Sequence, residues 1–427
     1  MTGPVVSGAG PGRRQARVGF VLATLAIDAL GFGIVVPIVP SLVLRLSNLP
    51  PSAAAVWTGA LLAAFSAMQF LCAPLLGALS DSYGRRPVLL LSLSGVCANY
   101  LLLAWAPSLA WLFVGRLIAG ATAANVSAAT AYIADVTPPQ LRAQRFGLVG
   151  AMFGLGFVLG PAVGGLLGAY GLRLPFLAAA ALAGLNVLYG LFVLPESLAP
   201  ERRRAFAWRR ANPVGTLGAV AADPAYLRLA AAWCCAWFAL GALQSSFVLA
   251  NDLRLGWGPR ENGAALAAMG VGSALVQGLV VRRLIPATGE RRAALLGYAC
   301  AALAYLLFAV AARSWIVYAG IAVQALGAVS GPAVQALVSA RAGPERQGEV
   351  QGALASLQGL TAIGSPLIAG WLFGVFAPRG LPGAPFLLAA LSYGLAFAAV
   401  RGLARPGHRD ASGGSGRGEA AVGLQDG

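Results

Sequence analysis

Charged side chains are too scarce in this sequence to cover the surface of a soluble protein. Only 10% of the 427 residues are charged, whereas an average soluble domain has about 25%. Hydrophobic residues make up 58% of the chain, and the mean hydropathy is +0.76. A soluble globular protein is therefore excluded, and the composition predicts a membrane protein.

Residues suited to metal binding and catalysis are equally scarce. The single histidine is His408, and none of the five cysteines has metal-ligand spacing with it, which argues against a zinc site and a histidine proton relay. No Gly-x-x-x-x-Gly-Lys loop is present to bind ATP, and no hydrolytic or redox set of residues occurs. We therefore expect neither an enzyme nor a protein with a metal or another cofactor.

The sequence does contain a series of long apolar runs. A bilayer core of roughly 30 Å needs about 20 apolar residues per helix. Twelve runs meet this length and predict an all-α membrane protein with twelve transmembrane helices. The predicted spans are 18–40, 57–79, 87–106, 110–134, 144–169, 173–194, 228–250, 262–281, 293–312, 315–340, 347–376 and 383–403.

The basic residues, all of them arginine, are distributed unequally between the two sides of the predicted membrane. Short loops rich in arginine stay in the cytoplasm. Most arginines lie on the side that also holds both ends of the chain, so both termini are predicted to be cytoplasmic. The net charge of +16 is then explained by topology and by contact with the lipid bilayer, and not by binding to nucleic acid. The opposite loops carry only Arg45, Arg173, Arg254, Arg260, Arg313 and Arg379.

The longest polar interruption divides the predicted helices into two sets of six. It runs from Pro195 to Asp223 and contains several arginines. A polar segment rich in glycine and serine follows the last span and is expected to be disordered. The predicted organisation is a cytoplasmic N-terminal tail (1–17), a first six-helix bundle (18–194), a cytoplasmic central loop (195–227), a second six-helix bundle (228–405) and a disordered cytoplasmic tail (406–427).

A short charged segment, Gly77-Ala-Leu-Ser-Asp81-Ser-Tyr-Gly84-Arg85-Arg86, connects the second and third predicted spans. Asp81 can form charge-assisted bonds with Arg85 and Arg86, and such bonds would hold the ends of the two helices in one arrangement. The alternative is a set of solvated loop charges of little energetic value. We predict a gating hinge made of Gly77, Asp81, Gly84, Arg85 and Arg86.

Two charged residues are predicted to lie deep within spans. Asp28 is in the first span, where an ionised carboxylate costs on the order of 2.5–3.5 kcal/mol. Burial favours the neutral form of a carboxyl group, so Asp28 is a candidate to bind and release a proton. Arg116, in the fourth span, keeps its charge and acts only electrostatically. The alternative roles are structural: Asp28 would order the first helix, and Arg116 would organise buried polar groups.

Glycine recurs along one face of the fifth predicted span. Gly156, Gly160 and Gly164 are four residues apart, so they let another helix approach closely. Pro161 adds a break in the backbone hydrogen-bond ladder. Helix packing alone explains the three glycines, whereas the added Pro161 and Gly165 favour a conformational pivot.

These segments resemble the major facilitator superfamily, in particular its twelve-helix drug/proton antiporter branch, which includes the tetracycline-efflux proteins. The resemblance covers most of residues 20–200 and continues more weakly beyond them. It rests on the hinge, on Ile27-Asp28-Ala-Leu-Gly31-Phe-Gly33 with Pro37 and Pro40, on Arg116-Leu-Ile-Ala-Gly120, and on the pattern from Gly147 to Gly165.

The resemblance implies a major facilitator fold in which twelve helices form two six-helix bundles around a midplane site. It implies a monomeric secondary transporter in a bacterial inner membrane, which exports a small amphipathic or hydrophobic compound in exchange for protons. Asp28 and Arg116 would couple protons, and Asp135 would join the hinge. The antiport motif would consist of Gly147, Gly156, Gly160, Pro161, Gly164 and Gly165.

The sequence departs from characterised tetracycline exporters at two places. Those proteins have an acid in the third helix, where this chain has Asn99, and another in the ninth, where this chain is neutral around Ala301. Fewer carboxylates predict weaker recognition of a metal–tetracycline complex, so tetracycline is not the expected preferred substrate. Several polar or aromatic residues are candidates to line the substrate path, although packing or bonding between helices explains each one equally well. They are Gln69, Asn99, Gln244, Phe247 and Gln335.

Three alternative functions stay open on the sequence alone. A metabolite exporter and a facilitator without proton coupling would both use the same scaffold. A membrane sensor or assembly factor would keep the packing glycines but would not need Asp28 or a hinge with two states.

Overall fold

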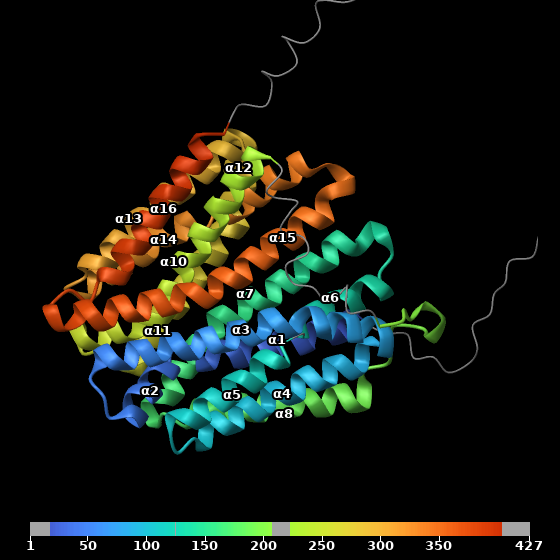
Figure 1. Ribbon diagram of the computed structural model, residues 1–427, viewed down its shortest axis with the longest axis horizontal. Helices are drawn as coiled ribbons and strands as arrows, with labels where there is room; N and C mark the ends of the chain where they lie inside the picture. The colour runs from blue at the N-terminus through green and yellow to red at the C-terminus, as the bar shows by residue number, and fades with distance from the viewer. Residues whose placement is uncertain (1–17, 124, 207–222, 404–427) are drawn as a thin grey trace, which may run out of the picture.

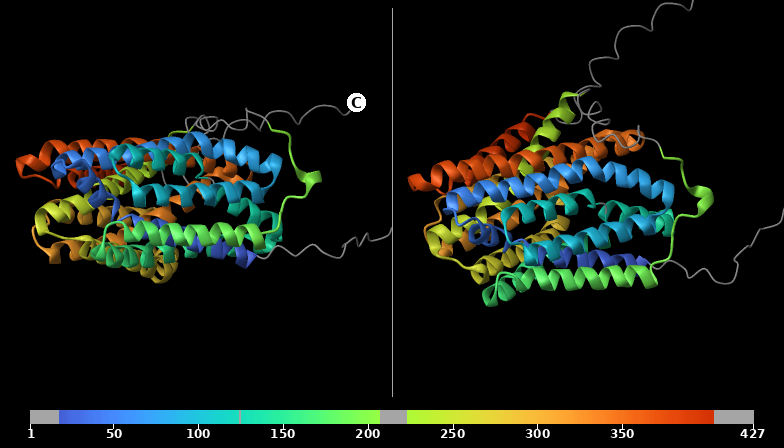
Figure 2. Two further views of the ribbon diagram at one scale, coloured as in Figure 1. Left: turned by 90° about the horizontal axis from the view of Figure 1, so that it is seen from below. Right: turned by 60° about the horizontal axis from the view of Figure 1, so that its bottom comes forward.

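The computed structural model describes residues 18–123, 125–206 and 223–403. Within these ranges the chain is helical and has no strand, and most helices run roughly along one axis (Figures 1 and 2). Eleven of the described helices are long and apolar enough to cross a membrane, or twelve if one bent pair counts as a single span. The prediction of an all-α membrane protein is confirmed. The predicted tails, 1–17 and 406–427, lie outside the described residues.

The first predicted span, 18–40, consists of two helices. α1 (Val18–Val35) and α2 (Val39–Ser47) form a pair that is bent by 42°. Pro37 and Pro40 account for the break, because proline has no amide hydrogen with which to continue a helix. The predicted end of this span at residue 40 is therefore wrong, since α2 continues to Ser47.

Some other spans of the first half are longer than predicted, and one is interrupted. The fourth span has a break near Thr122, because α5 (Leu109–Ala121) ends there and α6 (Asn125–Val136) follows. The remaining helices of this half are α3 (Pro51–Tyr83), α4 (Arg85–Trp105), α7 (Pro139–Tyr170) and α8 (Leu174–Val193).

The second half begins with α10 (Pro224–Leu255) and contains a π-helical stretch, η3 (Val276–Val280), in its second span. α15 (Ser330–Phe376) completes one predicted span and forms the next, so the backbone between 340 and 347 is helical instead of an open loop. The other elements that follow α8 are η1 (Pro200–Arg202), α11 (Pro259–Leu275), α12 (Val281–Thr288), α13 (Glu290–Val310), α14 (Ser314–Gly327), η4 (Ala377–Arg379) and α16 (Ala384–Arg401).

Each half of the chain has its own hydrophobic core. Tyr132 and Phe176 are completely buried in the first half. Tyr305 and Phe373 are completely buried in the second half. This arrangement agrees with two bundles separated at the central loop, while the exact domain boundaries stay a prediction.

The two halves touch mainly through two helix pairs, α3 with α15 and α7 with α11, and α10 also contacts α2 and α3. Glycine allows the backbones to approach at both places. A Cβ added at Gly59 would lie 2.2 Å from the Pro366 carbonyl oxygen, and one added at Gly165 would lie 2.8 Å from the Gly263 Cα. These contacts are at the end of the molecule remote from the loop between α3 and α4. We call that end the far end, and the end that carries Asp81 to Arg86 the hinge end.

Toward the hinge end the two halves diverge (Figure 1). Gly77 follows Gly59 by 18 residues, and Gly147 precedes Gly165 by 18, which is five helical turns of about 3.6 residues each. Gly77 and Gly147 therefore lie on the same faces as the two contact glycines. No other described part of the protein lies within 4 Å of an added Cβ at either position. Among the described residues, these glycine faces of α3 and α7 thus contact the other half at Gly59 and Gly165 and not at Gly77 and Gly147.

Candidate functional site

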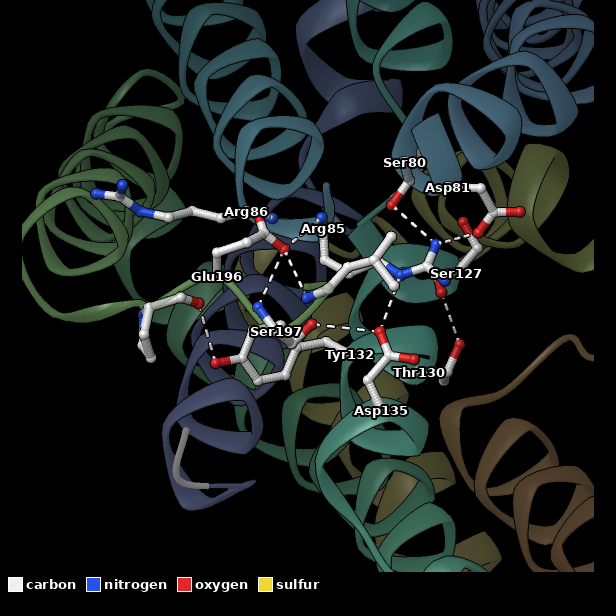
Figure 3. Close-up of polar contacts among 12 residues, drawn as sticks. Ser80, Asp81, Arg85, Arg86, Ser127, Thr130, Tyr132, Asp135, Glu196 and Ser197 are labelled. Atoms are coloured by element: carbon white, nitrogen blue, oxygen red, sulfur yellow. Dashed lines mark hydrogen bonds and ion pairs between the residues drawn. The ribbon is translucent and has the colours of Figure 1, made fainter. Parts of the chain in front are cut away.

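The predicted hinge forms a connected set of ion pairs at the ends of α3, α4 and α6 (Figure 3). The Arg85 guanidinium lies 2.5 Å from an Asp81 carboxylate oxygen and donates from Nε to Asp135 over 3.1 Å. It also donates to the Ser80 hydroxyl, and Ser197 donates to the same Asp135 oxygen over 3.3 Å. The Arg85 side chain is only 12% exposed, whereas that of Asp81 is 40% exposed. The guanidinium is therefore shielded from water, while the carboxylates stay in contact with it.

Glu196 is a further member of this network that the sequence did not reveal. Its carboxylate accepts hydrogen bonds from the backbone N–H groups of Arg85 over 2.8 Å and Arg86 over 3.1 Å, the first two residues of α4. It also accepts from the N–H groups of Ser197 and Leu198. The first amides of a helix have no partner within it and carry partial positive charge. Glu196 therefore stabilises the start of α4.

Gly84 joins α3 to α4 in a conformation that other residues rarely adopt. Its φ is 113°, and glycine has no Cβ to oppose such a value. A Cβ at this position would also lie 2.4 Å from Oε2 of Glu196. Both the backbone conformation and the approach of the carboxylate require glycine here.

Two more hydrogen bonds attach the end of α8 to this region. Arg86 donates from Nη2 to the Leu191 carbonyl over 2.6 Å. The Tyr132 hydroxyl of α6 donates to the Pro195 carbonyl over 3.1 Å. The ends of α3, α4, α6 and α8 are thus fixed relative to one another. We call Asp81, Arg85, Asp135 and Glu196 the hinge network.

A second group of polar residues lies inside the first half, around Tyr100 of α4. Its ring packs on α1, where a Cβ added at Gly31 would lie 3.4 Å from it. Gly31 is one helical turn from Asp28, which is half-buried. Tyr100 is thus a buried polar neighbour of the helix that carries Asp28, and no sequence motif pointed to it.

Arg116 of α5 is buried with unused donors. Its residue exposure is 7%, and its Nε and Nη2 atoms have no hydrogen-bond partner among the described residues. Asn99 is 2% exposed and packs on Gly115, the residue before Arg116, since its Oδ1 would be 3.1 Å from a Cβ added there. That oxygen is also unpaired within the described ranges. Asn99 thus lies in the interface between α4 and α5 and supplies no charge to balance Arg116.

The other residues predicted to line a substrate path have different surroundings. Gln69 and Gln335 are exposed, and Gln244 is half-buried. Phe247 is 2% exposed and packs edge-on against Phe308, with 5.6 Å between the ring centroids. Phe247 therefore belongs to the core of the second half in this structure. The role of all these residues in substrate binding stays a prediction.

The glycine-rich face of α7 packs closely on α1. A Cβ added at Gly156, Gly160 or Gly164 would lie 2.5 Å or less from α1 atoms. The Pro161 carbonyl oxygen approaches the second half instead, since a Cβ added at Gly263 would lie 2.5 Å from it. α7 is thus in close contact both with its own half and, through Gly165 and Pro161, with α11.

The sequence matches the family model described as Major Facilitator Superfamily, over residues 21–312 and 251–425. The chain is 41% identical to the tetracycline resistance protein, class C, of Escherichia coli, and the aligned region covers 82% of this chain and 87% of that protein. The class G protein of Vibrio anguillarum is 37% identical, with 81% and 87% covered. The crystal structure of the human organic anion transporter MFSD10 (TETRAN) is similar with a TM-score of 0.67 at 28% identity, and 92% of this chain and 100% of that chain are covered. These similarities extend through both halves.

Proposed function

Since the chain belongs to the Major Facilitator Superfamily, we propose that it exports a small amphipathic compound in exchange for protons. It is a multi-pass membrane transporter and not an enzyme. The observations that carry the proposal are the half-buried Asp28 within α1, the Tyr100 ring packed one turn away from it, and the buried Arg116 of α5. A protonatable acid and a permanent cation thus lie inside one bundle.

The proton on Asp28 would determine how strongly α1 is attracted to α5. Ionised Asp28 and the permanent charge of Arg116 attract each other, whereas neutral Asp28 feels little of that attraction. Loss and gain of the proton would therefore favour two arrangements of these helices in turn. Such a shift between two states is what coupling of protons to transport requires.

The arginine distribution supports an orientation in which the hinge end and both termini face the cytoplasm of a bacterial cell, with the helices in the inner membrane. In that orientation, divergence of the two halves at the hinge end corresponds to the inward-open state. Transport by a monomer would then alternate between this state and one in which the hinge end is closed and the far end is open.

Two features bear on the substrate. The relatives named for tetracycline resistance favour a polycyclic compound. Asn99 and the neutral region around Ala301 disfavour a metal complex, because they offer no carboxylate. A Cβ added at Gly327 would lie 3.0 Å from the Ala301 Cβ, so this region is also closely packed. An amphipathic aromatic compound without a bound metal ion fits both features.

An organic anion is the second candidate. Arg116 is a buried cation with two nitrogen atoms unpaired among the described residues, and neutral Asn99 packs on the preceding residue, Gly115. A buried charge without a counter-charge is costly, so an anionic substrate would be favoured there. The similarity to the human organic anion transporter supports this candidate.

Proteoliposomes with an imposed pH gradient test the proposal. We expect uphill flux of an amphipathic aromatic compound, or of an aromatic carboxylate for the second candidate, with protons moving in the opposite direction. Asp28→Asn should abolish the uphill flux. Glu201→Gln is the matched control, because it also replaces a carboxylate by an amide but at an exposed position of η1. Downhill flux alone would indicate a facilitator. No flux of any of the compounds tested would favour a sensor.

A further inference from the structure

One face of α10 carries aromatic and polar residues that the transport proposal has not used. Trp233, Trp237, Leu240 and Gln244 are separated by four, three and four residues, so they lie along one side of the helix. All four are half-buried. The two indole rings are neighbours, with centroids 6.1 Å apart and planes inclined by 55°.

The other sides of α10 are occupied by neighbouring helices. The Ala232 and Ala239 carbonyls accept hydrogen bonds from tyrosines of α13, and the Cys235 carbonyl accepts one from Ser392 of α16. Gly241 meets α15, since an added Cβ would lie 2.0 Å from the Ser365 hydroxyl oxygen. The tryptophan face points away from these partners, toward the interior of the molecule.

This face lies at the depth of Asp28 in the opposite half. Asp28 is 10 residues from the start of α1, and Trp233 is 9 residues from the start of α10. Both helices start at the hinge end, and a helix rises about 1.5 Å per residue, so both side chains lie roughly 15 Å along their helices. The halves diverge at the hinge end, so a molecule that enters there would meet both residues.

One hydrogen-bonding atom of this face has no partner among the described residues, namely the buried Nε1 of Trp233. Buried indole N–H groups usually have a partner. An unused donor beside two aromatic rings suits a flat ligand with an acceptor at its edge.

We propose that Trp233 and Trp237 form the binding surface of the second half for the aromatic part of the transported compound. Trp233 Nε1 donates a hydrogen bond to a carbonyl or phenolic oxygen of this compound, and Trp237 contacts its ring face. This assignment rests on the proposed transport function and adds the substrate class, namely a planar aromatic molecule with an oxygen acceptor at its edge.

Equilibrium binding to the purified full-length protein tests the assignment with two probes. Metal-free tetracycline, kept so by a chelator, is a fused-ring compound with carbonyl oxygens, whereas ethidium is a planar aromatic cation without them. Trp233→Phe keeps a ring but removes the N–H donor, and it should weaken tetracycline binding about two- to tenfold while ethidium binding is unchanged. Trp237→Ala removes aromatic surface and should weaken the binding of both probes about two- to tenfold.

Trp371→Phe is the matched control, since Trp371 is in the same half on α15 but is 58% exposed. It should bind both probes like the parent, and thermal unfolding of each variant checks that the fold is retained. The assignment is overturned if the parent protein shows no saturable tetracycline binding, or if folded Trp233→Phe binds tetracycline as tightly as the parent. Binding needs no pH gradient, so a failure of proton-driven flux would contradict the proposed function and leave this result unaffected.

Discussion

Gly84 shows how one residue without a side chain can determine the geometry of the hinge network. Its φ of 113° and the Glu196 carboxylate, 2.4 Å from an added Cβ, both oppose any replacement. We expect Gly84→Ala to lower the free energy of unfolding by about 1–3 kcal/mol. Thermal unfolding in detergent measures this. Gly77→Ala is the matched control, because Gly77 is helical with open space around it and alanine favours helix there. Equal losses in the two variants would contradict the account.

Asn99 is the residue at which charge balance around Arg116 can be changed directly. An aspartate there would lie in the same interface and supply the missing negative charge. We expect Asn99→Asp to improve binding of magnesium–tetracycline and to weaken binding of an aromatic carboxylate, because Arg116 would then be neutralised within the protein. Binding titrations with both probes measure the two effects. Asn99→Ala controls for loss of the amide, and a parallel change in both affinities would speak against this role.

At the scale of helices, Glu196 determines how α4 begins. Its carboxylate pairs with the first two amides of α4 from a position more than a hundred residues away in sequence. We expect Glu196→Gln to cost about 1–2 kcal/mol of stability, because the amide is a weaker partner for the positive end of a helix. Hydrogen exchange at Arg85 and Arg86 should accelerate. Glu201→Gln should leave this exchange unchanged, and protection equal to that of the parent in Glu196→Gln would refute the capping role.

The helices and the local part of the hinge could be predicted from the sequence, whereas contacts between distant segments could not. Asp81 and Arg85 are four residues apart on either side of the short connection at Gly84, so their ion pair joins groups that are close in sequence. Glu196 and Tyr100 have no such local signal, because their partners depend on how α8 and α1 pack. Pro37 was visible in the sequence as part of a motif, but proline alone does not determine whether a span kinks or ends. The unpaired Trp233 Nε1 is a property of the packed bundle only.

At the scale of the whole molecule, paired glycines mark where the two halves meet. Gly59 and Gly165 make backbone contacts at the far end, and Gly77 and Gly147 lie five turns away on the same faces without neighbours. We expect leucine at Gly77 or Gly147 to prevent close approach of the halves at the hinge end and so to keep the protein inward-open. Spin labels are placed on α3 and α15 where each helix lies at the hinge end of the molecule. The distances between them measure the populations in which the hinge end is open or closed.

Gly394→Leu is the control for this experiment, because Gly394 of α16 also has open space around it but lies on a helix whose main contacts are all within the second half. Its distance distribution should match that of the parent. A short-distance population that persists in both Gly77→Leu and Gly147→Leu would show that the hinge end closes through other surfaces.

The exchange of protons for substrate is the central claim, and proton movement driven by a substrate gradient tests it most directly. Proteoliposomes carrying a pH-sensitive dye are loaded with the aromatic compound that gives the fastest flux, and the internal pH is followed after dilution. The parent protein should move protons inward as the compound leaves, and Asp28→Asn should bind the compound but move no protons. Proton movement at the parental rate in Asp28→Asn would contradict the account.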